Sequence, residues 1–454
     1  MLNDKDTIVA PATPPGVAAL AVIRLSGAQA IEIASTVFRG KNLLDVESHT
    51  IHFGSIRENE KVIDEVLISV FKNPHSYTGE NSVEISCHGS PVVVKEIIKL
   101  LIKQGARLAE PGEFTRRAFL NNKLDLAQAE AVGDLIHSET ELSRQVAVNQ
   151  MRGGYSKNLS HMREELIHFA SLIELELDFG EEDVEFAQRE DLIRLTNQIL
   201  TFIQPLIESF DQGNVIKNGV PTVIAGKPNA GKSTLLNALL NDERAIVSDI
   251  PGTTRDFIED EIVLDGISFR FIDTAGLRET TDQVEHMGIQ RTKERMEKAS
   301  LILYLFDLAN ETKESMITQI ESLKSLDARV ILVGNKADIA QHETITFAKE
   351  NHFVLIAAFA KQNLEQLKKE ILNTVLNKEI KSGGLIVTNL RHFESLRQTH
   401  EALSRVKEGI ESGITGDLVA QDIRQALHYL GELTGAITTD DLLGNIFSKF
   451  CIGK

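Results

Sequence analysis

Residues 226–233 have the types and spacing needed to hold a chain of phosphates. They read GKPNAGKS and match the pattern G-x-x-x-x-G-K-S/T at every fixed position. An apolar run at 221–225 precedes them and a helix-forming run at 234–240 follows, so the loop has a strand–loop–helix context. There, backbone N–H groups and the helix N-terminus face phosphate oxygens, Lys232 reaches the β- and γ-phosphates, and Ser233 binds Mg²⁺. The alternative, a glycine-rich turn before an ordinary helix, is disfavoured by both flanks.

A second motif indicates which base accompanies the phosphates. Residues 335–338 read NKAD and follow an apolar strand at 330–333. The Asp338 carboxylate can accept two hydrogen bonds from guanine that adenine cannot offer, Asn335 would face the guanine carbonyl edge, and the Lys336 stem would pack over the base. Residues 357–359 follow the last strand, where such folds present a backbone N–H to the base, but they read AAF where Ser-Ala-Lys is usual. The combination favours GTP over ATP.

Two further motifs complete the pattern of a GTPase domain. Residues 273–276 read DTAG after a strand ending at Ile272; Asp273 would hold Mg²⁺ through water and the Gly276 N–H would bind the γ-phosphate. Residues 252–256 read GTTRD and lie where a switch loop supplies a hydroxyl to Mg²⁺. Position 277 is leucine, whereas small GTPases carry a glutamine that orients the attacking water. The water must then be positioned by a polar residue of 278–286 or by a partner.

Composition bounds the class of protein. At 454 residues the chain is long enough for about three domains. Its net charge of −18 argues against a protein that coats nucleic acid with its whole surface, so a nucleic-acid site must be a local basic patch or be shared with a basic partner. Cys87 and Cys451 form neither a disulfide framework nor a metal-binding cluster. The N-terminus does not resemble a secretory signal, and no apolar run approaches the roughly 18 residues that cross a bilayer, so we expect a cytoplasmic protein.

The elements that position these motifs fall into four segments. Residues 1–118 alternate short apolar runs, at 7–10, 18–23, 63–71 and 82–88, with helical runs at 28–38 and 92–103, and end in a loop at 110–115. Residues 119–217 carry helical stripes over 159–177 and 192–210, with a boundary signal at 212–214. Residues 218–379 alternate strands and helices, including a helix expected at 288–299, which is typical of a doubly wound parallel sheet. Residues 380–454 are helical again. We therefore expect a multidomain α/β plus all-α protein, with the α/β GTPase domain inserted between two pieces of one helical domain.

Over essentially its whole length the chain resembles the MnmE family (also called TrmE) of bacterial tRNA-modification GTPases. Besides the nucleotide motifs, the resemblance rests on residues 6–10 (DTIVA), 111–114 (PGEF), 122–130 (NKLDLAQAE), 440–444 (DDLLG) and the terminal CIGK. That tail does not fit the aliphatic pattern of a prenylation signal.

The resemblance implies a fold and a reaction. The N-terminal domain would resemble tetrahydrofolate-binding proteins and form a homodimer. With an FAD-binding partner, MnmG, the family adds an aminomethyl-type group (aminomethyl or carboxymethylaminomethyl) at the 5-position of the wobble uridine of tRNA, using a one-carbon unit from a formyl- or methylene-tetrahydrofolate. By motif match the folate would contact Arg24, Glu84, Lys123 and Lys454, and Cys451 is thought to matter.

The resemblance also implies how the missing glutamine is replaced. Two GTPase domains would meet across a K⁺ ion held by Asn229, Ser248, Ile250 and Thr253, and Glu285 would orient the water. Catalytic roles are then expected for Glu285, Lys232 and Asp273, and Mg²⁺ ligation for Ser233 and Thr254. The expected GTP contacts are Asn229, Ala230, Gly231, Lys232, Ser233, Thr234, Ser248, Asp249, Ile250, Pro251, Gly252, Thr253, Thr254, Asp273, Thr274, Ala275, Gly276, Asn335, Lys336, Ala337, Asp338, Ala357, Ala358 and Phe359.

A second hypothesis is a regulatory GTPase that acts in ribosome assembly or binds RNA without modification chemistry. It shares the phosphate loop and the NKAD motif. Such GTPases tend to carry a basic RNA-binding module, whereas this chain is acidic and ends in CIGK. The first hypothesis is therefore preferred.

Overall fold

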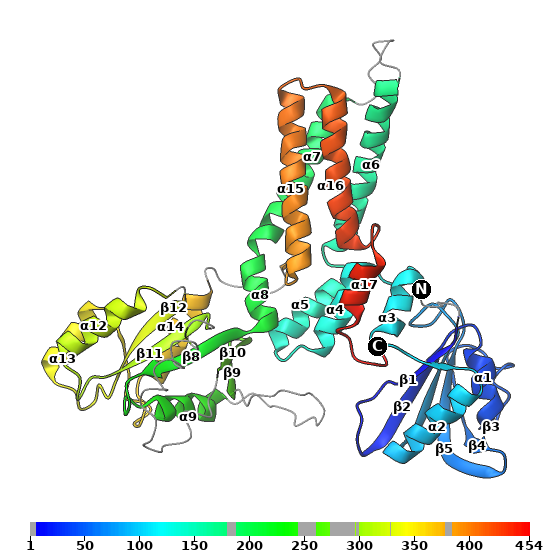
Figure 1. Cartoon of the computed structure of the whole chain (residues 1–454), viewed down its shortest axis with the longest axis horizontal. Helices are drawn as coiled ribbons and strands as arrows, with labels where there is room; N and C mark the ends of the chain where they lie inside the picture. The colour runs from blue at the N-terminus through cyan, green and yellow to red at the C-terminus, as the bar shows by residue number, and fades with distance from the viewer. Residues whose placement is uncertain are drawn as a thin grey trace.

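The computed structural model describes residues 6–178, 188–243, 260–272, 296, 299–326, 328–376 and 384–454. Two sheets lie at opposite ends of the molecule, with helices between them and a bundle of long helices rising from the middle (Figure 1). No helix within the described ranges is both long and apolar enough to cross a membrane.

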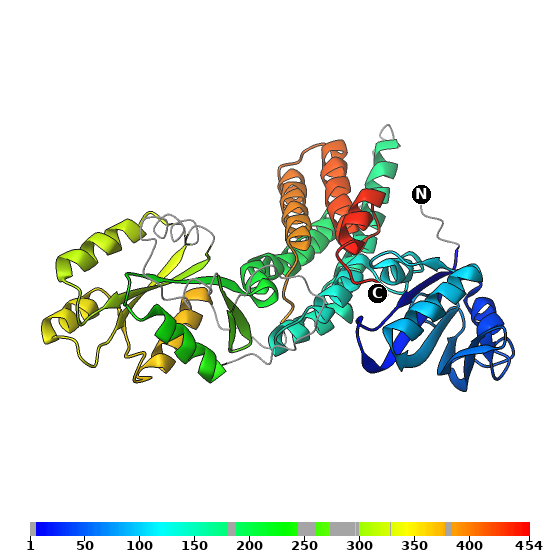
Figure 2. The same ribbon diagram turned by 60° about the horizontal axis from the view of Figure 1, so that its bottom comes forward.

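The N-terminal part is a sheet covered on one face by helices α1 and α2 (Figures 1 and 2). Its strands run in the order β3-β4-β5-β6-β2-β1-β7 and are antiparallel except for β1 and β7. The elements are β1 (Ile8–Pro11), β2 (Ala18–Ser26), α1 (Ala30–Val37), β3 (Phe38–Arg39), β4 (Thr50–Glu58), β5 (Lys61–Phe71), β6 (Ser82–Gly89), α2 (Pro91–Lys103), β7 (Arg107–Leu108) and α3 (Glu113–Leu120). The loop expected at 110–115 is wrong in its second half, because Gly112 takes a left-handed conformation and α3 begins directly after it.

Alternation along the strands explains why one face of this sheet is covered and the other is open. In β5, Val66, Ile68 and Val70 are buried under the helices, while Leu67 between them points the other way and is exposed. Phe53 of β4 lies opposite Leu67 and is also exposed. The open face therefore carries apolar side chains.

The helical part is one body made from two stretches of sequence. The first stretch supplies α4 (Leu126–Ile136), α5 (Glu141–Met151), α6 (Ser156–Asp178), α7 (Arg189–Glu208) and α8 (Phe210–Asn218); the second supplies α15 (Leu390–Glu411), α16 (Gly416–Thr434) and α17 (Asp440–Phe447). The stripes on α6 and α7 share one core with those on α15 and α16. This shared core confirms that the α/β domain is inserted within the helical domain.

The boundary signal at 212–214 falls inside helix α8 and does not interrupt it. Gly213 lies inside α8, and a Cβ atom there would come within 2.0 Å of the Val387 carbonyl oxygen. The backbone N–H of Val387 also donates to Ser209 Oγ at 3.0 Å. Glycine is therefore present at this position because the returning chain packs directly against the helix.

The inserted domain is a sheet in the order β13-β12-β11-β8-β10-β9 with helices on its faces. Its elements are β8 (Val220–Gly226), α9 (Lys232–Glu243), β9 (Asp260–Leu264), β10 (Ile267–Phe271), β11 (Leu301–Asp307), α12 (Lys313–Leu323), β12 (Arg329–Asn335), α13 (His342–Glu350), β13 (Val354–Leu355) and α14 (Leu364–Val375). Strands β13 to β10 are parallel, as expected, whereas the edge strand β9, which the sequence did not predict, is antiparallel to β10. The helix expected at 288–299 falls almost wholly outside the described residues.

Candidate functional site

The phosphate-loop segment connects β8 to α9, at the edge of the sheet where the parallel strands end. Gly226 has φ +140°, and a Cβ there would lie 2.3 Å from the Leu305 carbonyl oxygen. Gly231 has φ +96°, and its Cβ would lie 2.3 Å from Asn335 Nδ2. Both fixed glycines of the motif are thus required by close approach as well as by conformation.

Lys232 folds back over its own loop. Its Nζ donates to the carbonyl oxygens of Gly226 at 3.0 Å and Lys227 at 2.8 Å, and burial lowers the pKa of its ammonium group. Asn229 has φ +63°, and Ser233 and Thr234 follow Lys232 in the first turn of α9. The lysine charge, the loop backbone and the helix N-terminus are therefore gathered in one place, as a phosphate site requires.

Asn335 joins the phosphate-loop segment to the loop at 357–359, which is predicted to contact the base. It is 3% exposed; its Nδ2 donates to the Ala230 carbonyl at 2.8 Å, and its Oδ1 accepts from the Ala358 N–H at 3.0 Å. Both ends of the Asn335 amide thus hold backbone groups of neighbouring loops, while its expected place at the guanine carbonyl edge stays a prediction. Sequence reasoning missed this role because the partners lie 105 and 23 residues away.

The rest of the NKAD motif lies beside these contacts. Lys336 Nζ lies 2.6 Å from Asp307 Oδ2, and the Ala337 N–H donates to the Ile356 carbonyl at 3.0 Å. Burial raises the pKa of the Asp307 carboxyl, but hydrogen bonds from Lys336 and Asn310 outweigh it and hold that pKa below its ordinary value. Asp338 is exposed at the end of the motif. Its carboxylate is available for hydrogen bonds to a base.

The remaining nucleotide-site predictions fall outside the described residues. They are the switch residues Ser248, Asp249, Ile250, Pro251, Gly252, Thr253 and Thr254, the DTAG residues Asp273, Thr274, Ala275 and Gly276, and the water-orienting Glu285. The assigned Mg²⁺ ligand Thr254, and every assigned K⁺ ligand except Asn229, belong to this group.

Three of the four residues assigned to folate come together beside the C-terminal tail. Arg24 Nη2 lies 2.8 Å from Glu84 Oε1, and Arg24 Nη1 donates to the Gly453 carbonyl at 3.4 Å. Lys454 follows, and burial together with the charge of Arg24 lowers the pKa of its ammonium group. Lys123 instead donates to the Pro74 carbonyl at 3.1 Å, with no described contact to the other three.

The tail is held in place by its backbone. Gly453 has φ +97°, and a Cβ there would lie 2.2 Å from the Pro11 carbonyl oxygen. Exposed Cys451 accepts from the Gly112 N–H at 3.4 Å through its carbonyl. Sequence reasoning also missed Tyr77, whose ring centroid lies 5.4 Å from the Arg24 guanidinium carbon.

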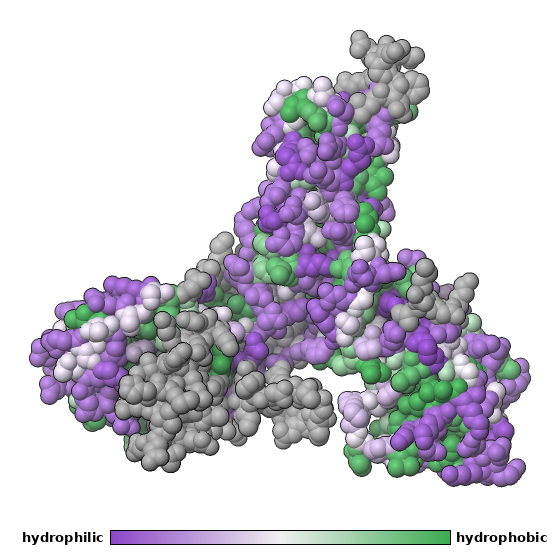
Figure 3. Space-filling view, viewed as in Figure 1, coloured by the Kyte–Doolittle hydropathy of each residue, from purple (hydrophilic) through white to green (hydrophobic). Residues whose placement is uncertain are grey.

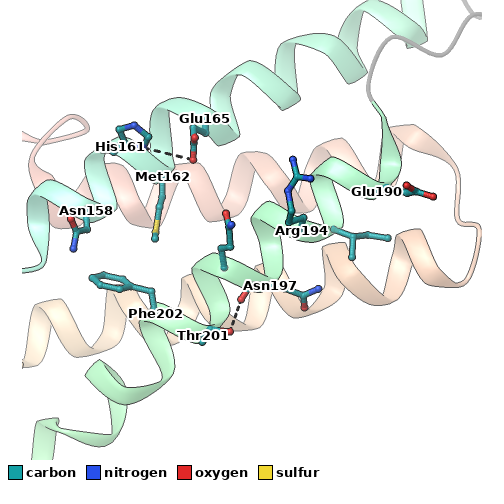
Figure 4. A pocket seen from close by; sticks show the side chains of 11 residues that line it. Asn158, His161, Met162, Glu165, Glu190, Arg194, Asn197, Thr201 and Phe202 are labelled. Carbon is teal, nitrogen blue, oxygen red and sulfur yellow. Dashed lines mark hydrogen bonds and ion pairs between the residues drawn. The ribbon is translucent and has the colours of Figure 1, made fainter.

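A surface groove lies elsewhere, between α6 and α7 in the bundle (Figure 4). It has a volume of about 1060 Å³, and Met162 and Phe202 point into it from facing helices. The groove contains none of the predicted site residues. It is lined by Asn158, His161, Met162, Glu165, Glu190, Ile193, Arg194, Asn197, Gln198, Thr201 and Phe202.

Comparison with known proteins covers the whole chain. The family described as "GTP-binding protein TrmE N-terminus" matches residues 7–123, and the "MnmE helical domain" matches residues 126–451. A "tRNA modification GTPase MnmE" from Cytophaga hutchinsonii is 57% identical, with 100% of this chain and 98% of the relative covered. The protein of the same description from Flavobacterium johnsoniae is 51% identical, with both chains fully covered. Among solved structures, the G domain of FeoB from Methanococcus jannaschii is 25% identical over 34% of this chain and 97% of its own, at a TM-score of 0.25.

Proposed function

Because the chain belongs to the MnmE family, we propose that it is a GTPase that acts in tRNA modification and hydrolyses GTP to GDP and phosphate. The observation that carries the proposal is the Asn335 amide, which binds the Ala230 carbonyl and the Ala358 N–H and so joins the phosphate loop to the base-recognition loops. Such a link would couple the loop at the phosphates to the loops at the base of one bound nucleotide.

In the proposed binding step the nucleotide replaces contacts that the loop makes with itself. Lys232 would exchange the carbonyls of Gly226 and Lys227 for the β- and γ-phosphates. Ser233 and Thr254 would ligate Mg²⁺, which neutralises charge on the phosphates, and Asp273 would hold the ion through water. Asp338 would select guanine through its two-point hydrogen bonding.

For hydrolysis we propose a K⁺ ion at the face of the site. Asn229 would ligate it together with Ser248, Ile250 and Thr253, and its charge would stabilise the phosphate oxygens as an arginine finger does elsewhere. The left-handed backbone of Asn229 supports this, because it belongs to the loop around the phosphates. Since position 277 is leucine, Glu285 would orient the attacking water.

The modification itself would join two macromolecular partners and a folate. We propose that, with the FAD-binding protein MnmG, the chain adds an aminomethyl-type group at the 5-position of the wobble uridine of tRNA, in the cytoplasm. A formyl- or methylene-tetrahydrofolate would supply the carbon. Arg24, Glu84 and Lys454 fit such a ligand because two cations and a carboxylate meet beside the aromatic ring of Tyr77. Lys123 contacts the 74–80 loop, and it would reach the folate from that side of the site.

A homodimer through the N-terminal sheets is part of the proposal. The open face of the sheet presents Leu20, Ile51, Phe53 and Leu67, which are 46–66% exposed. Figure 3 views this part of the molecule from the side of α1 and α2 and shows that the bundle surface, by contrast with the open face, is mostly hydrophilic. Apolar surface of this kind is what a second copy would cover.

The test is GTP hydrolysis in K⁺ and in Na⁺ at equal ionic strength. We expect faster hydrolysis in K⁺, loss of that rate with retained GTP binding in Glu285→Ala, and loss of GTP binding in Lys232→Ala. Equal rates in the two salts would contradict the K⁺ site. Full activity of Lys232→Ala would contradict the whole nucleotide assignment, and a K⁺-stimulated GTPase that leaves tRNA unmodified with MnmG and folate present would favour the regulatory alternative.

A further inference from the structure

Two large apolar side chains stand exposed at the base end of the nucleotide site. Phe359 is 95% exposed and Ile339 is 69% exposed. Ile339 directly follows Asp338, and Phe359 directly follows Ala358. Both project from the loops that carry the proposed guanine contacts.

The loop that carries Phe359 is held by hydrogen bonds on both sides. Ala357 and Gln362 exchange two backbone hydrogen bonds, of 3.3 and 3.1 Å, and the Lys361 N–H donates to the Ala358 carbonyl at 3.4 Å. Ala357 and Ala358 are buried beneath. Phe359 therefore stands at the tip of a closed turn, where its ring adds nothing to the core.

The same turn is fixed relative to the base-selecting carboxylate. The Ala358 N–H is held by Asn335 Oδ1 at 3.0 Å, and the Ala337 N–H by the Ile356 carbonyl at 3.0 Å. One bond ties the residue before Phe359 to the first residue of the NKAD motif, and the other ties the residue before Asp338 to the end of the last strand region. A base bound to the Asp338 carboxylate would therefore be close to the loop that carries Phe359.

We propose that the Phe359 ring stacks on the guanine of the bound nucleotide and is a specificity-independent source of affinity at this site. The inference rests on the proposed function, because it requires a guanine nucleotide there. Stacking suits the position because every base offers a flat face, and an aromatic ring already exposed to water loses no packing when it covers that face. Asp338 would choose the base and Phe359 would hold it.

The first experiment measures binding of GDP and of GTP to Phe359→Ala by calorimetry. Aromatic stacking on one base predicts a loss of about 5- to 150-fold. The loss should be equal for GDP and GTP, because the two differ only at the phosphates. Ile339→Ala is the matched control, since it removes a comparably exposed apolar side chain from the neighbouring loop and should change affinity little.

A second measurement uses the absence of tryptophan from the sequence. Phe359→Trp would be the only tryptophan, and stacking predicts that GDP quenches its fluorescence while retaining near-normal affinity. Affinity of Phe359→Ala equal to that of the unchanged protein, or an unquenched tryptophan at saturating GDP, would overturn the stacking role alone. Failure of the unchanged protein to bind GDP would overturn the nucleotide site itself.

Discussion

The carboxylate of Glu130 binds α4 to the start of α15, across the two stretches of the helical domain. It is 8% exposed and lies 2.6 Å from Arg391 Nη2 and 2.5 Å from His392 Nε2. The other ring nitrogen of His392 shares a hydrogen bond of 2.6 Å with the buried Tyr155 hydroxyl. Charge, imidazole and phenol thus satisfy one another where water is excluded.

Removing this carboxylate should weaken the fold strongly. Glu130→Ala leaves Arg391 and His392 without their partner in a buried place, so we expect the free energy of unfolding to fall by about 3–5 kcal/mol. Urea denaturation followed by circular dichroism measures it. Glu141→Ala, which breaks an exposed pair with Arg144, is the control and should change little. A small effect at both positions would show that the buried cluster contributes no net stability.

The same carboxylate should make stability depend on acid. Burial alone would raise the pKa of Glu130, but the charges of His392 and Arg391 outweigh it and hold the pKa far below the ordinary 4.5. Below about pH 4.5 the unfolded chain therefore takes up a proton that the folded chain does not, and stability falls toward the depressed folded pKa. We expect the melting temperature to drop less steeply between pH 5 and pH 3 in Glu130→Gln than in the unchanged protein. Parallel slopes would contradict the depressed pKa.

At two glycines, a helix or a turn packs directly against a distant segment of the chain, which the surrounding sequence does not explain. Gly213 in α8 lies against the Val387 backbone, and Gly266, in the turn between β9 and β10, would place a Cβ 2.9 Å from Leu142 Cβ of α5. The second contact joins the inserted domain to the helical domain through a hairpin. The predicted switch residues 248–254 and the DTAG residues 273–276 lie before and after that hairpin in the sequence.

Adding one methyl group to α8 should test the first of these contacts. In Gly213→Ala the new Cβ would lie 2.0 Å from a backbone oxygen, so we expect a loss of about 1–3 kcal/mol despite alanine's better helix propensity. Gly409→Ala in α15 is the matched control, because its Cβ would meet Val419 Cγ2 at an ordinary 3.4 Å. That variant should be unchanged or more stable by up to about 1 kcal/mol. Thermal melting compares them, and equal melting temperatures would contradict the close approach.

How far the sequence predicts these elements depends on how local their cause is. The helical stripes of α6, α7, α15 and α16 and the glycines of the phosphate loop follow from spacing along a few turns, and they were predicted. The edge strand β9 is only five residues long and owes its place to pairing with β10, so its local pattern carried little signal. The Asn335 bridge and the Tyr77 ring beside Arg24 depend on partners far away in sequence, which periodicity cannot reveal.

At the scale of the whole molecule, the open sheet face is the surface that the proposed dimer would bury. Phe53 and Leu67 lie opposite each other on neighbouring strands, at 66% and 46% exposure. Charged side chains at these two positions would be costly to bury and would therefore prevent a dimer contact through this face.

The proposed dimer predicts that the unchanged protein runs as a dimer in size exclusion with light scattering at micromolar concentration, and that the double variant Phe53→Lys, Leu67→Glu runs as a monomer. Its opposite charges face each other across the strands and keep the sheet stable. Val92→Lys is the control, because Val92 is 69% exposed on α2, which covers the other face, and that variant should remain dimeric. A dimer that survives the double change would place the contact elsewhere.

The discontinuous bundle also determines the order in which its helices become available during translation. Helix α7 ends at Glu208 and α15 begins at Leu390, so residues 209–389 must be translated before α15 and α16 exist. At about 5–20 residues per second that takes roughly 10–40 s. The N-terminal sheet, whose strands all precede residue 109, can be complete by then, while the apolar stripes of α6 and α7 still lack the helices that cover them in the finished protein. The nascent chain thus exposes the apolar faces of α6 and α7 on the ribosome until the inserted domain and the helices after it have been translated.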